Sequence, residues 1–502
     1  MAELELWGAW TDNAVIQRDQ KNTLEGSGKL GALVAVNFAN NYFETKVSSN
    51  GTWSIVLSIL EASGPFTLEI KSGSSSLRLV NIWVGDVWIC AGQSNMQMQL
   101  NACGSINRDE INSNIHYLRQ NKELSLTPRN KVNSVWKCID EESLYSCSAL
   151  SYHYGNLLSH AMSNNVKVGV IVVAVGHTPI VSWMPEEKVF KNKNLRGELE
   201  KRNSCMPIDG TSQPDMLKYQ NEFDDMRTKI EKEDTWYKDA LKKKEQDHVY
   251  EKRDPKVGYP WIAGNPWWAS VLYNGMLAPL IYTKARGLIW YQGETDAILE
   301  RSSVYSKCLI DLIETVRNNQ DNRFSVFIIM LANHDDVQCL DADNYWPILR
   351  QQQIEVAKKC NARIVSAIDL GEPYDIHPKD KMSIAKRCVN SFLKKSDSES
   401  FYDGPYLDVN KYILQKNNIK IFFHNLSVLK VKGDIKNVLE LYAEDLSVIC
   451  IKNIVVHSTY IEVEWDEGAK PSCLRYSYNA NPTAWIYNHD ELPVLPFEIN
   501  FN

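Results

Sequence analysis

Residues 84–96 read VGDVWICAGQSNM, and this stretch decides the fold. The predominantly apolar run Val84–Cys90 is typical of a parallel strand that is buried on both faces. It ends at a glycine and is followed by polar residues that open a predicted helix. Ser94 therefore stands at the carboxyl end of a strand, where the backbone N–H groups of a helix start can bind an anion. We predict a strand, a tight turn and a helix, with Ser94 exposed at the junction.

Similar apolar runs recur along the chain and alternate with helical patterns. The predicted buried strands are 84–90, 168–175, 287–290, 325–331 and 363–368. The predicted helices lie around 152–163, 269–283, 303–317, 347–359 and 380–394. Alternation of this kind predicts a doubly wound α/β domain, whose chemistry lies at the carboxyl ends of the strands.

The two ends of the chain have a different pattern. Short strand-like runs at 33–38, 53–59, 66–70 and 77–84 are separated by turn-forming residues, which predicts a small β-sandwich. Strand-like runs return after about residue 405. The predicted domains are a β-rich module at 1–82, a catalytic domain at 83–400 and a second β-rich module at 401–502. A charged segment at 190–260 interrupts the catalytic domain, and we interpret it as a solvated helical insertion.

Composition excludes several classes of protein. The 502 residues carry 55 Lys and Arg against 62 Asp and Glu, a formal charge of −7 that gives no field for binding nucleic acid. The longest apolar run, Val168–Gly176, is far shorter than the roughly 20 residues of a membrane-spanning helix. The start MAELELWGAW lacks the features of a secretory signal, as expected of a cytosolic protein or of a mature form without its leader.

Polar residues cluster at three predicted strand ends. Ser94 follows the first, WYQGE at 290–294 ends the third, and DLGEPYDIHP at 369–378 follows the fifth. A nucleophilic serine needs exposure, a base and donors for the developing oxyanion, and such a cluster can supply all three. The alternative is that Ser94 only caps a helix. Met96 fills the last position of G-x-S-x-G, which disfavours an α/β-hydrolase elbow.

The segments GQSNM, WYQGE and DIHP resemble the sialate O-acetylesterases, a branch of the SGNH-hydrolase superfamily, and the similarity covers nearly the whole chain. The resemblance implies a three-layer α/β/α domain with a mostly parallel sheet, flanked by β-rich modules. It also implies a serine esterase that removes O-acetyl groups from free or glycan-linked sialic acid, without a cofactor or metal. A secreted or lysosomal location follows if a leader has been removed; the oligomeric state is not predicted.

The resemblance also assigns roles to residues. Ser94 falls on the nucleophile and His377 on the general base, while the N–H groups of Ser94 and Gly176 and the side chain of Gln292 fall on the oxyanion hole. The chain departs from the pattern at His177, where the family usually has a second glycine, and this adds bulk beside the oxyanion hole.

The acid that orients the histidine is a second departure. The superfamily's acid commonly lies three residues before the histidine, which is Tyr374 in this chain. Asp375 is the preferred candidate, because residues two apart in an extended segment point to one side. Glu372 is the rival. A Ser-His dyad that is oriented by a backbone carbonyl is the third alternative.

Further residues are candidates for binding the sugar. Arg350 would pair with a sialic-acid carboxylate or, as is more often the case, with a structural acid. Trp183 would stack on a sugar face or pack in the core, and the same alternatives hold for Trp267 and Trp268. Glu294 is a candidate for binding the substrate or, together with Asp296, for supporting the third strand end.

Two rival functions use the same sequence. One is an O-acetylesterase for another carbohydrate, such as acetylated xylan. The other is a non-catalytic glycan-binding protein, and the intact pair of Ser94 and His377 argues against it.

Overall fold

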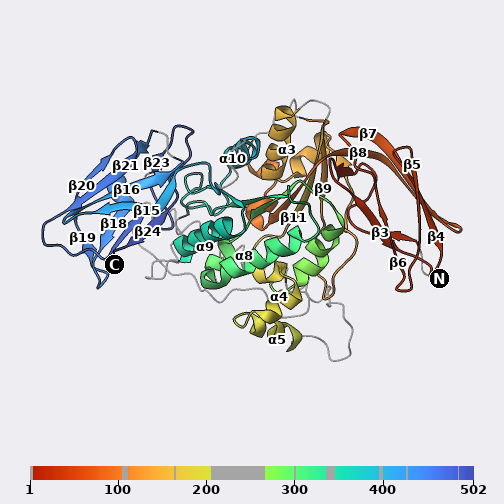
Figure 1. Ribbon diagram of the computed structural model, residues 1–502, viewed down its shortest axis with the longest axis horizontal. Helices are drawn as coiled ribbons and strands as arrows, with labels where there is room; N and C mark the ends of the chain where they lie inside the picture. Colours follow the sequence, from red (N-terminus) through yellow and green to blue (C-terminus); the bar gives the residue numbers. More distant parts are fainter. Residues whose placement is uncertain are drawn as a thin grey trace.

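The computed structural model describes residues 4–104, 111–162, 166–204, 266–298, 301–334, 345–394, 400–425, 428–483 and 485–501. In chain order it contains a β-rich region, a central α/β region and a second β-rich region (Figure 1). Most of the predicted charged insertion, from residue 205 to 260, lies outside the described residues. Its described beginning includes the end of helix α4 (Glu186–Lys191) and helix α5 (Arg196–Ser204).

A mixed sheet of eleven strands forms the frame of the molecule. Seven of its strands take part in parallel pairs: six lie in the order β9, β11, β8, β12, β13 and β14, and Val15–Gln17 (β2) pairs with β8. Strand β10 pairs antiparallel with β9 at the edge. These strands span Lys137–Cys138 (β10), Ile115–Arg119 (β9), Lys167–Ala174 (β11), Ser75–Gly92 (β8), Gly287–Tyr291 (β12), Ser325–Ile329 (β13) and Arg363–Val365 (β14). The five predicted buried strands all lie in this part of the sheet. Strand β9, which lies between β10 and β11, was not predicted.

Strand β8 joins two parts that the sequence predicted as separate. The predicted strands 77–84 and 84–90 are one strand of 18 residues. Its first part pairs antiparallel with β7, and its second part pairs in parallel with β11 and β12. The N-terminal β-rich region and the central sheet therefore share one continuous strand.

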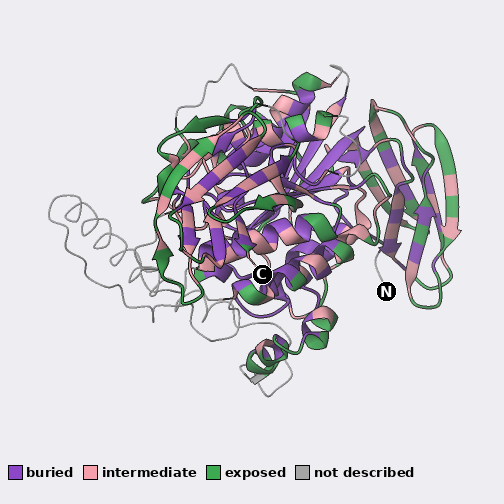
Figure 2. Cartoon of the chain, turned by 60° about the vertical axis from the view of Figure 1, so that its left-hand side comes forward, coloured by how far each residue is buried: buried purple, intermediate pink, exposed green. Residues whose placement is uncertain are grey.

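Helices cover both faces of the central sheet (Figure 1). Successive residues of β8 point to opposite faces, as the pleat requires: Ile89 belongs to the core under α8 and α9, and Trp88 to the core under α3 and α10. The helices span Ser94–Gln97 (α1), Glu141–Ser146 (α2), Ala149–Ala161 (α3), Glu186–Lys191 (α4), Arg196–Ser204 (α5), Glu294–Ile298 (α7), Ser302–Arg317 (α8), Tyr345–Lys359 (α9) and Lys381–Leu393 (α10). Figure 2 shows that buried residues dominate the central strands. No helix in the described ranges is long and apolar enough to cross a membrane.

One predicted helix has a different form. Residues 269–283 were predicted as an α-helix, but the chain forms a π-helical turn, Tyr273–Leu277 (η4), followed by a 3₁₀ turn, Ala278–Tyr282 (η5). Pro279 lies at the start of the second turn. Proline lacks an N–H group and its ring clashes with the carbonyl four residues earlier, which disfavours regular α-helix here.

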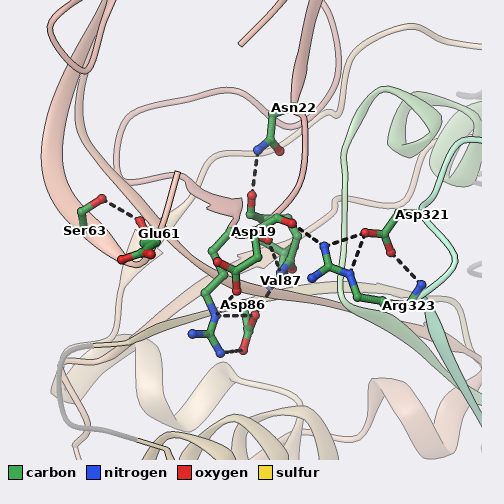
Figure 3. Close-up of polar contacts among 10 residues, drawn as sticks. Asp19, Asn22, Glu61, Ser63, Asp86, Val87, Asp321 and Arg323 are labelled. Atoms are coloured by element: carbon green, nitrogen blue, oxygen red, sulfur yellow. Dashed lines mark hydrogen bonds and ion pairs between the residues drawn. The ribbon is translucent and has the colours of Figure 1, made fainter. Parts of the chain in front are cut away.

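The N-terminal region is built from short strands, as predicted. Its strands span Glu5–Leu6 (β1), Val15–Gln17 (β2), Thr23–Ser27 (β3), Leu33–Phe38 (β4), Asn41–Lys46 (β5), Thr52–Val56 (β6) and Ser63–Ser72 (β7). Polar contacts hold it to the central domain (Figure 3). Gln17 and Arg18 both donate to the carboxylate of Asp86, at 2.9 and 3.0 Å, and Arg323 donates to the carbonyl of Asp19. The bonds from Gln17 and Arg18 compensate for the burial of the Asp86 carboxylate in strand β8.

The C-terminal region contains two four-stranded antiparallel sheets with an apolar core between them. One sheet consists of Tyr406–Leu414 (β15), Asn418–His424 (β16), Tyr460–Trp465 (β21) and Ile451–Val456 (β20). The other consists of Val448–Ile449 (β19), Leu439–Tyr442 (β18), Cys473–Tyr476 (β22) and Phe497–Asn500 (β24). A two-stranded sheet, Lys430–Lys432 (β17) and Trp485–Tyr487 (β23), lies beside them.

Candidate active site

Ser94 lies where strand β8 passes into helix α1. A Cβ atom on Gly92, whose φ is +148°, would be 2.0 Å from the carbonyl oxygen of Tyr291. Glycine is therefore required for the turn, in which the amide of Gln93 bonds to the same carbonyl at 3.0 Å. Ser94 is half-buried and is the first residue of α1, so its amide has no acceptor within the helix. The predicted strand, turn and helix are confirmed.

Gly176 lies beside Ser94, directly after strand β11. A Cβ atom built on Gly176 would be 3.3 Å from the Cβ of Ser94. The amide of Gly176 donates to the side-chain oxygen Oε1 of Gln97 at 2.8 Å. An oxygen atom thus already binds the amide that the sequence predicted as an oxyanion donor. A substrate oxygen that takes this place must displace the Gln97 side chain.

His177 adopts a backbone conformation that glycine normally fills. Its φ is +56°, in the left-handed region that costs a residue with a Cβ about 1–2 kcal/mol. The imidazole is exposed and contacts the ring of Trp267, with 5.1 Å between the ring centroids. The indole Nε1 of Trp267 donates to the carbonyl of His177 at 2.5 Å. The ring contact and the hydrogen bond with Trp267 together hold His177 in place beside Gly176, the predicted oxyanion donor.

His377 lies on the loop between β14 and α10, and a side chain from the Ser94 turn binds this loop. The Nδ2 atom of Asn95 donates to the carbonyl of Ile376 at 2.9 Å. One hydrogen bond therefore joins the residue after Ser94 to the residue before His377. The imidazole of His377 is 41% exposed. The structure brings the predicted nucleophile and base to the same edge of the sheet.

Asp375 contacts His377 in two ways. Its Oδ1 atom accepts the backbone N–H of His377 at 2.9 Å and lies 3.7 Å from the imidazole Nδ1. The second distance is too long for a hydrogen bond. The rival, Glu372, uses its Oε1 atom to accept the backbone N–H of Lys379 at 3.0 Å. Asp375, the preferred candidate, therefore lies at an ion-pair distance from the imidazole.

A buried polar network lies beneath the predicted nucleophile and base. The Nδ2 atom of Asn95 also donates to Oε1 of Glu294 at 2.6 Å, and its Oδ1 accepts Nζ of Lys381 at 2.7 Å. Glu294 is 2% exposed and Lys381 is fully buried. Burial raises the pKa of the Glu294 carboxyl and lowers the pKa of Lys381 to about 8. Glu294 was predicted to bind substrate or to support the strand end, and the structure places it in the supporting network.

Gln292 does not direct a donor toward Ser94. Its Nε2 atom donates to the carbonyl of Thr178 at 3.1 Å and to Oδ2 of Asp296 at 2.5 Å, so both amide hydrogens are engaged. Asp296 is buried, which raises the pKa of its carboxyl to about 6, and it also accepts the amide of Ile180 at 2.9 Å. The predicted role of Gln292 in the oxyanion hole does not fit this geometry. The side chain instead holds the segment that follows Gly176.

Arg350 was predicted as a ligand for a sialic-acid carboxylate, and the structure contradicts this. Its guanidinium is fully buried. It donates at 2.7–3.0 Å to the carbonyls of Leu331, Ala332, Asn479 and Ala480. Two of these carbonyls follow strand β13 and two belong to the C-terminal region. Arg350 therefore fastens the C-terminal region to the central domain.

For Trp183 the sequence left open stacking on a sugar and packing in the core, and packing is the more frequent role of such a tryptophan. It is fully buried, and its Nε1 atom donates to the hydroxyl of Thr178 at 3.0 Å. Trp268 is 1% exposed. Both are core residues, and the stacking prediction for them is wrong because neither ring reaches solvent.

Three residues of the site were missed as participants. Asn95 belongs to the stretch that was quoted for Ser94 and Gln97 directly follows it, and their polar side chains beside a nucleophile were the available signal. Lys381 gave no signal, since a lysine at the start of a helix is most often solvated. His334, Asp335 and Asp336 have the side-chain types of metal ligands but no complete ligand set, so no metal was predicted there; Asp335 and Asp336 lie outside the described residues.

Comparison with known proteins decides the family. The family model described as "Carbohydrate esterase, sialic acid-specific acetylesterase" matches residues 84–247 and 260–393, which include Ser94, Gly176 and His377. The chain belongs to this family. It is thus an enzyme, a carboxylic ester hydrolase that acts on O-acetylated carbohydrates.

Full-length relatives agree with this assignment. The chain is 24% identical over 457 residues to the human sialate O-acetylesterase, covering 82% of this chain and 75% of the relative. It is 25% identical over 426 residues to the mouse protein of the same name, covering 76% and 71%. The crystal structure of a carbohydrate acetylesterase from Xanthomonas citri superposes with a TM-score of 0.76 at 21% identity, over 99% of this chain and 100% of that one. The esterase thus shares its whole architecture with a solved carbohydrate esterase.

Proposed function

We propose that this esterase hydrolyses O-acetyl esters of sialic acids, 9-O-acetyl esters among them, through an acetyl-enzyme on Ser94. The observation that carries the proposal is the hydrogen bond from Asn95, the residue after Ser94, to the carbonyl of Ile376, the residue before His377. The sialic-acid substrate rests on the family and on the names of the relatives.

Each step of the proposed reaction has a residue. His377 accepts the hydroxyl proton of Ser94 while Oγ attacks the acetyl carbonyl carbon. The amides of Ser94 and Gly176 donate to the oxyanion that forms, after Gln97 has moved away. The bond to the sugar oxygen then breaks, and His377 protonates that oxygen. Water attacks the acetyl-enzyme with the same base, which releases acetate and restores Ser94.

The proposal extends to the architecture. We assign an SGNH-hydrolase-type catalytic domain to residues 83–400, with β-rich modules at 1–82 and 401–502. Support comes from the parallel strands of the central sheet and from the polar groups at their carboxyl ends. Strand β8 and the side chain of Arg350 connect the three modules.

The decisive experiment measures acetate release from 9-O-acetylated sialic acid and from acetylated xylan. We expect turnover of the sialic-acid ester, and loss of turnover on the order of 10⁶-fold in Ser94→Ala and in His377→Ala. His489→Ala, on a surface histidine that is 76% exposed, is the matched control and keeps full activity. Turnover of acetylxylan alone would assign the esterase to the other carbohydrate. Full activity in either active-site variant would refute the serine mechanism.

A further inference from the structure

Lys381 binds the loop that carries His377 from beneath. It is the first residue of helix α10, and its Nζ atom donates to the carbonyl of Pro378 at 2.6 Å and to Oδ1 of Asn95 at 2.7 Å. Asn95 donates in turn to the carbonyl of Ile376. The carbonyls on both sides of His377 are thus bound by two side chains that also bind each other.

A lysine at this position costs stability. Its ammonium group is removed from water, which is unfavourable unless the charge is paired and hydrogen-bonded. It also lies in the first turn of a helix, where the helix dipole disfavours positive charge. An apolar side chain would fill the same volume without either cost. What only a lysine supplies here is a cationic donor between the Ser94 turn and the His377 loop.

We propose that Lys381, together with Asn95 and Glu294, is a positioning residue that holds His377 in register with Ser94. This inference rests on the proposed function, in which a proton passes between the side chains of Ser94 and His377. Neither Lys381 nor Glu294 has to touch the substrate. Their contribution is the placement of the base, and misplacement by about 1 Å can cost about 100-fold in rate.

Because Lys381 is charged, we expect its positioning of His377 to depend on pH. The groups that face its ammonium are the carboxylates of Glu294, Glu372 and Asp375, the thiol of Cys103, and the ring of Tyr291 at 5.5 Å. Burial lowers the pKa of Lys381 to about 8, and Glu294 opposes this effect. As the pH rises through 8, the ammonium becomes an amine with one N–H fewer, and its hydrogen bonds lose their charge assistance. We therefore expect kcat to fall on the alkaline side of pH 8.

The first test replaces the lysine by an apolar side chain of similar length. In Lys381→Met we expect kcat to fall about 100-fold while KM stays within about threefold, because substrate contacts are unchanged. Lys386→Met, at an exposed position of the same helix, is the matched control and keeps the wild-type kcat and alkaline limb. Circular dichroism and thermal unfolding confirm that both variants are folded. A wild-type kcat in folded Lys381→Met would overturn the proposal.

The second test needs no change at Lys381. Glu294→Gln keeps an acceptor for Asn95 but removes the carboxylate that raises the pKa of Lys381. We expect the alkaline limb of the kcat profile to move to lower pH. An alkaline limb that stays in place in Glu294→Gln, or that is absent from the wild type, would overturn the proposal. Absence of any turnover or acetyl-enzyme in the wild type would instead overturn the proposed function, and this inference with it.

Discussion

Asp375→Asn tests how far a carboxylate supports the base. Asparagine keeps the Oδ1 atom that accepts the backbone N–H of His377 at 2.9 Å, so the loop retains its local bond. The substitution removes only the negative charge, which lies 3.7 Å from the imidazole Nδ1. Its effect on kcat therefore measures the stabilisation of the imidazolium that forms in the reaction.

The geometry sets the size of the effect. Two unit charges 3.7 Å apart interact by about 1 kcal/mol in bulk water and by about 4 kcal/mol at an effective dielectric constant of about 20. The two side chains are 41% and 45% exposed, which places the pair nearer the lower value. We expect a loss of about 1–2 kcal/mol, or about 5–30-fold in kcat. This is far below the loss of about 10⁴-fold that the same change causes in a buried Ser-His-Asp triad.

The assay is kcat on one acetyl ester, with Glu372→Gln and Tyr374→Phe as controls. Glutamine can keep the bond from the Lys379 amide, so we expect Glu372→Gln to stay within about twofold of the wild type. Tyr374 is half exposed, and phenylalanine removes only its hydroxyl group, so we expect Tyr374→Phe to be mild as well. A loss near 10⁴-fold in Asp375→Asn would refute the estimate and indicate a direct hydrogen bond in the working enzyme. A larger loss in Glu372→Gln than in Asp375→Asn would reassign the acid.

Three further variants test other contacts. Gln97→Ala removes the side-chain oxygen that accepts the Gly176 amide, a hydrogen bond worth about 1 kcal/mol. Because the substrate oxyanion then has no competitor for this amide, we expect kcat/KM to rise about fivefold. A fall in kcat/KM would show that Gln97 assists the reaction. His177→Gly relieves the strain of the left-handed backbone, and we expect the free energy of unfolding in chemical denaturation to rise by up to about 1 kcal/mol. A free energy of unfolding below that of the wild type would mean that the lost contact with Trp267 outweighs this relief. Arg350→Lys leaves buried carbonyls without a donor, so calorimetry should show a loss of about 3–5 kcal/mol in the free energy of unfolding. We expect KM to be unchanged in the folded enzyme. A raised KM together with wild-type stability would restore the ligand role of Arg350.

The sequence predicted those parts of the fold that depend on local pattern. Apolar runs of β-branched residues gave the central strands, and β11 spans Lys167–Ala174 where 168–175 was predicted. Strand β9 was missed because its short run, Ile115–Arg119, includes a histidine that looks polar. In the structure, Nδ1 of His116 lies 2.6 Å from the carbonyl of Asn13, a contact that no local pattern reveals.

The site divides in the same way. The polar segments that contain Ser94 and His377 were found because each follows a predicted strand, and strand ends of a parallel sheet meet at one edge. Gly176 was assigned through the family resemblance. The partners of Arg350 could not be predicted, since two of its four carbonyls lie about 130 residues further along the chain. Lys381 was missed for the same reason. Its bond to Asn95 spans 286 positions and exists only once both loops have folded.

The nucleophilic serine is the central claim, and covalent labelling tests it most directly. The wild-type protein is treated with a fluorophosphonate probe, digested and analysed by mass spectrometry. We predict a single labelled peptide that carries the probe on Ser94, and no label after substitution of His377 by alanine on the same time scale. Labelling of another serine, or none on folded protein that hydrolyses the ester, would contradict the mechanism.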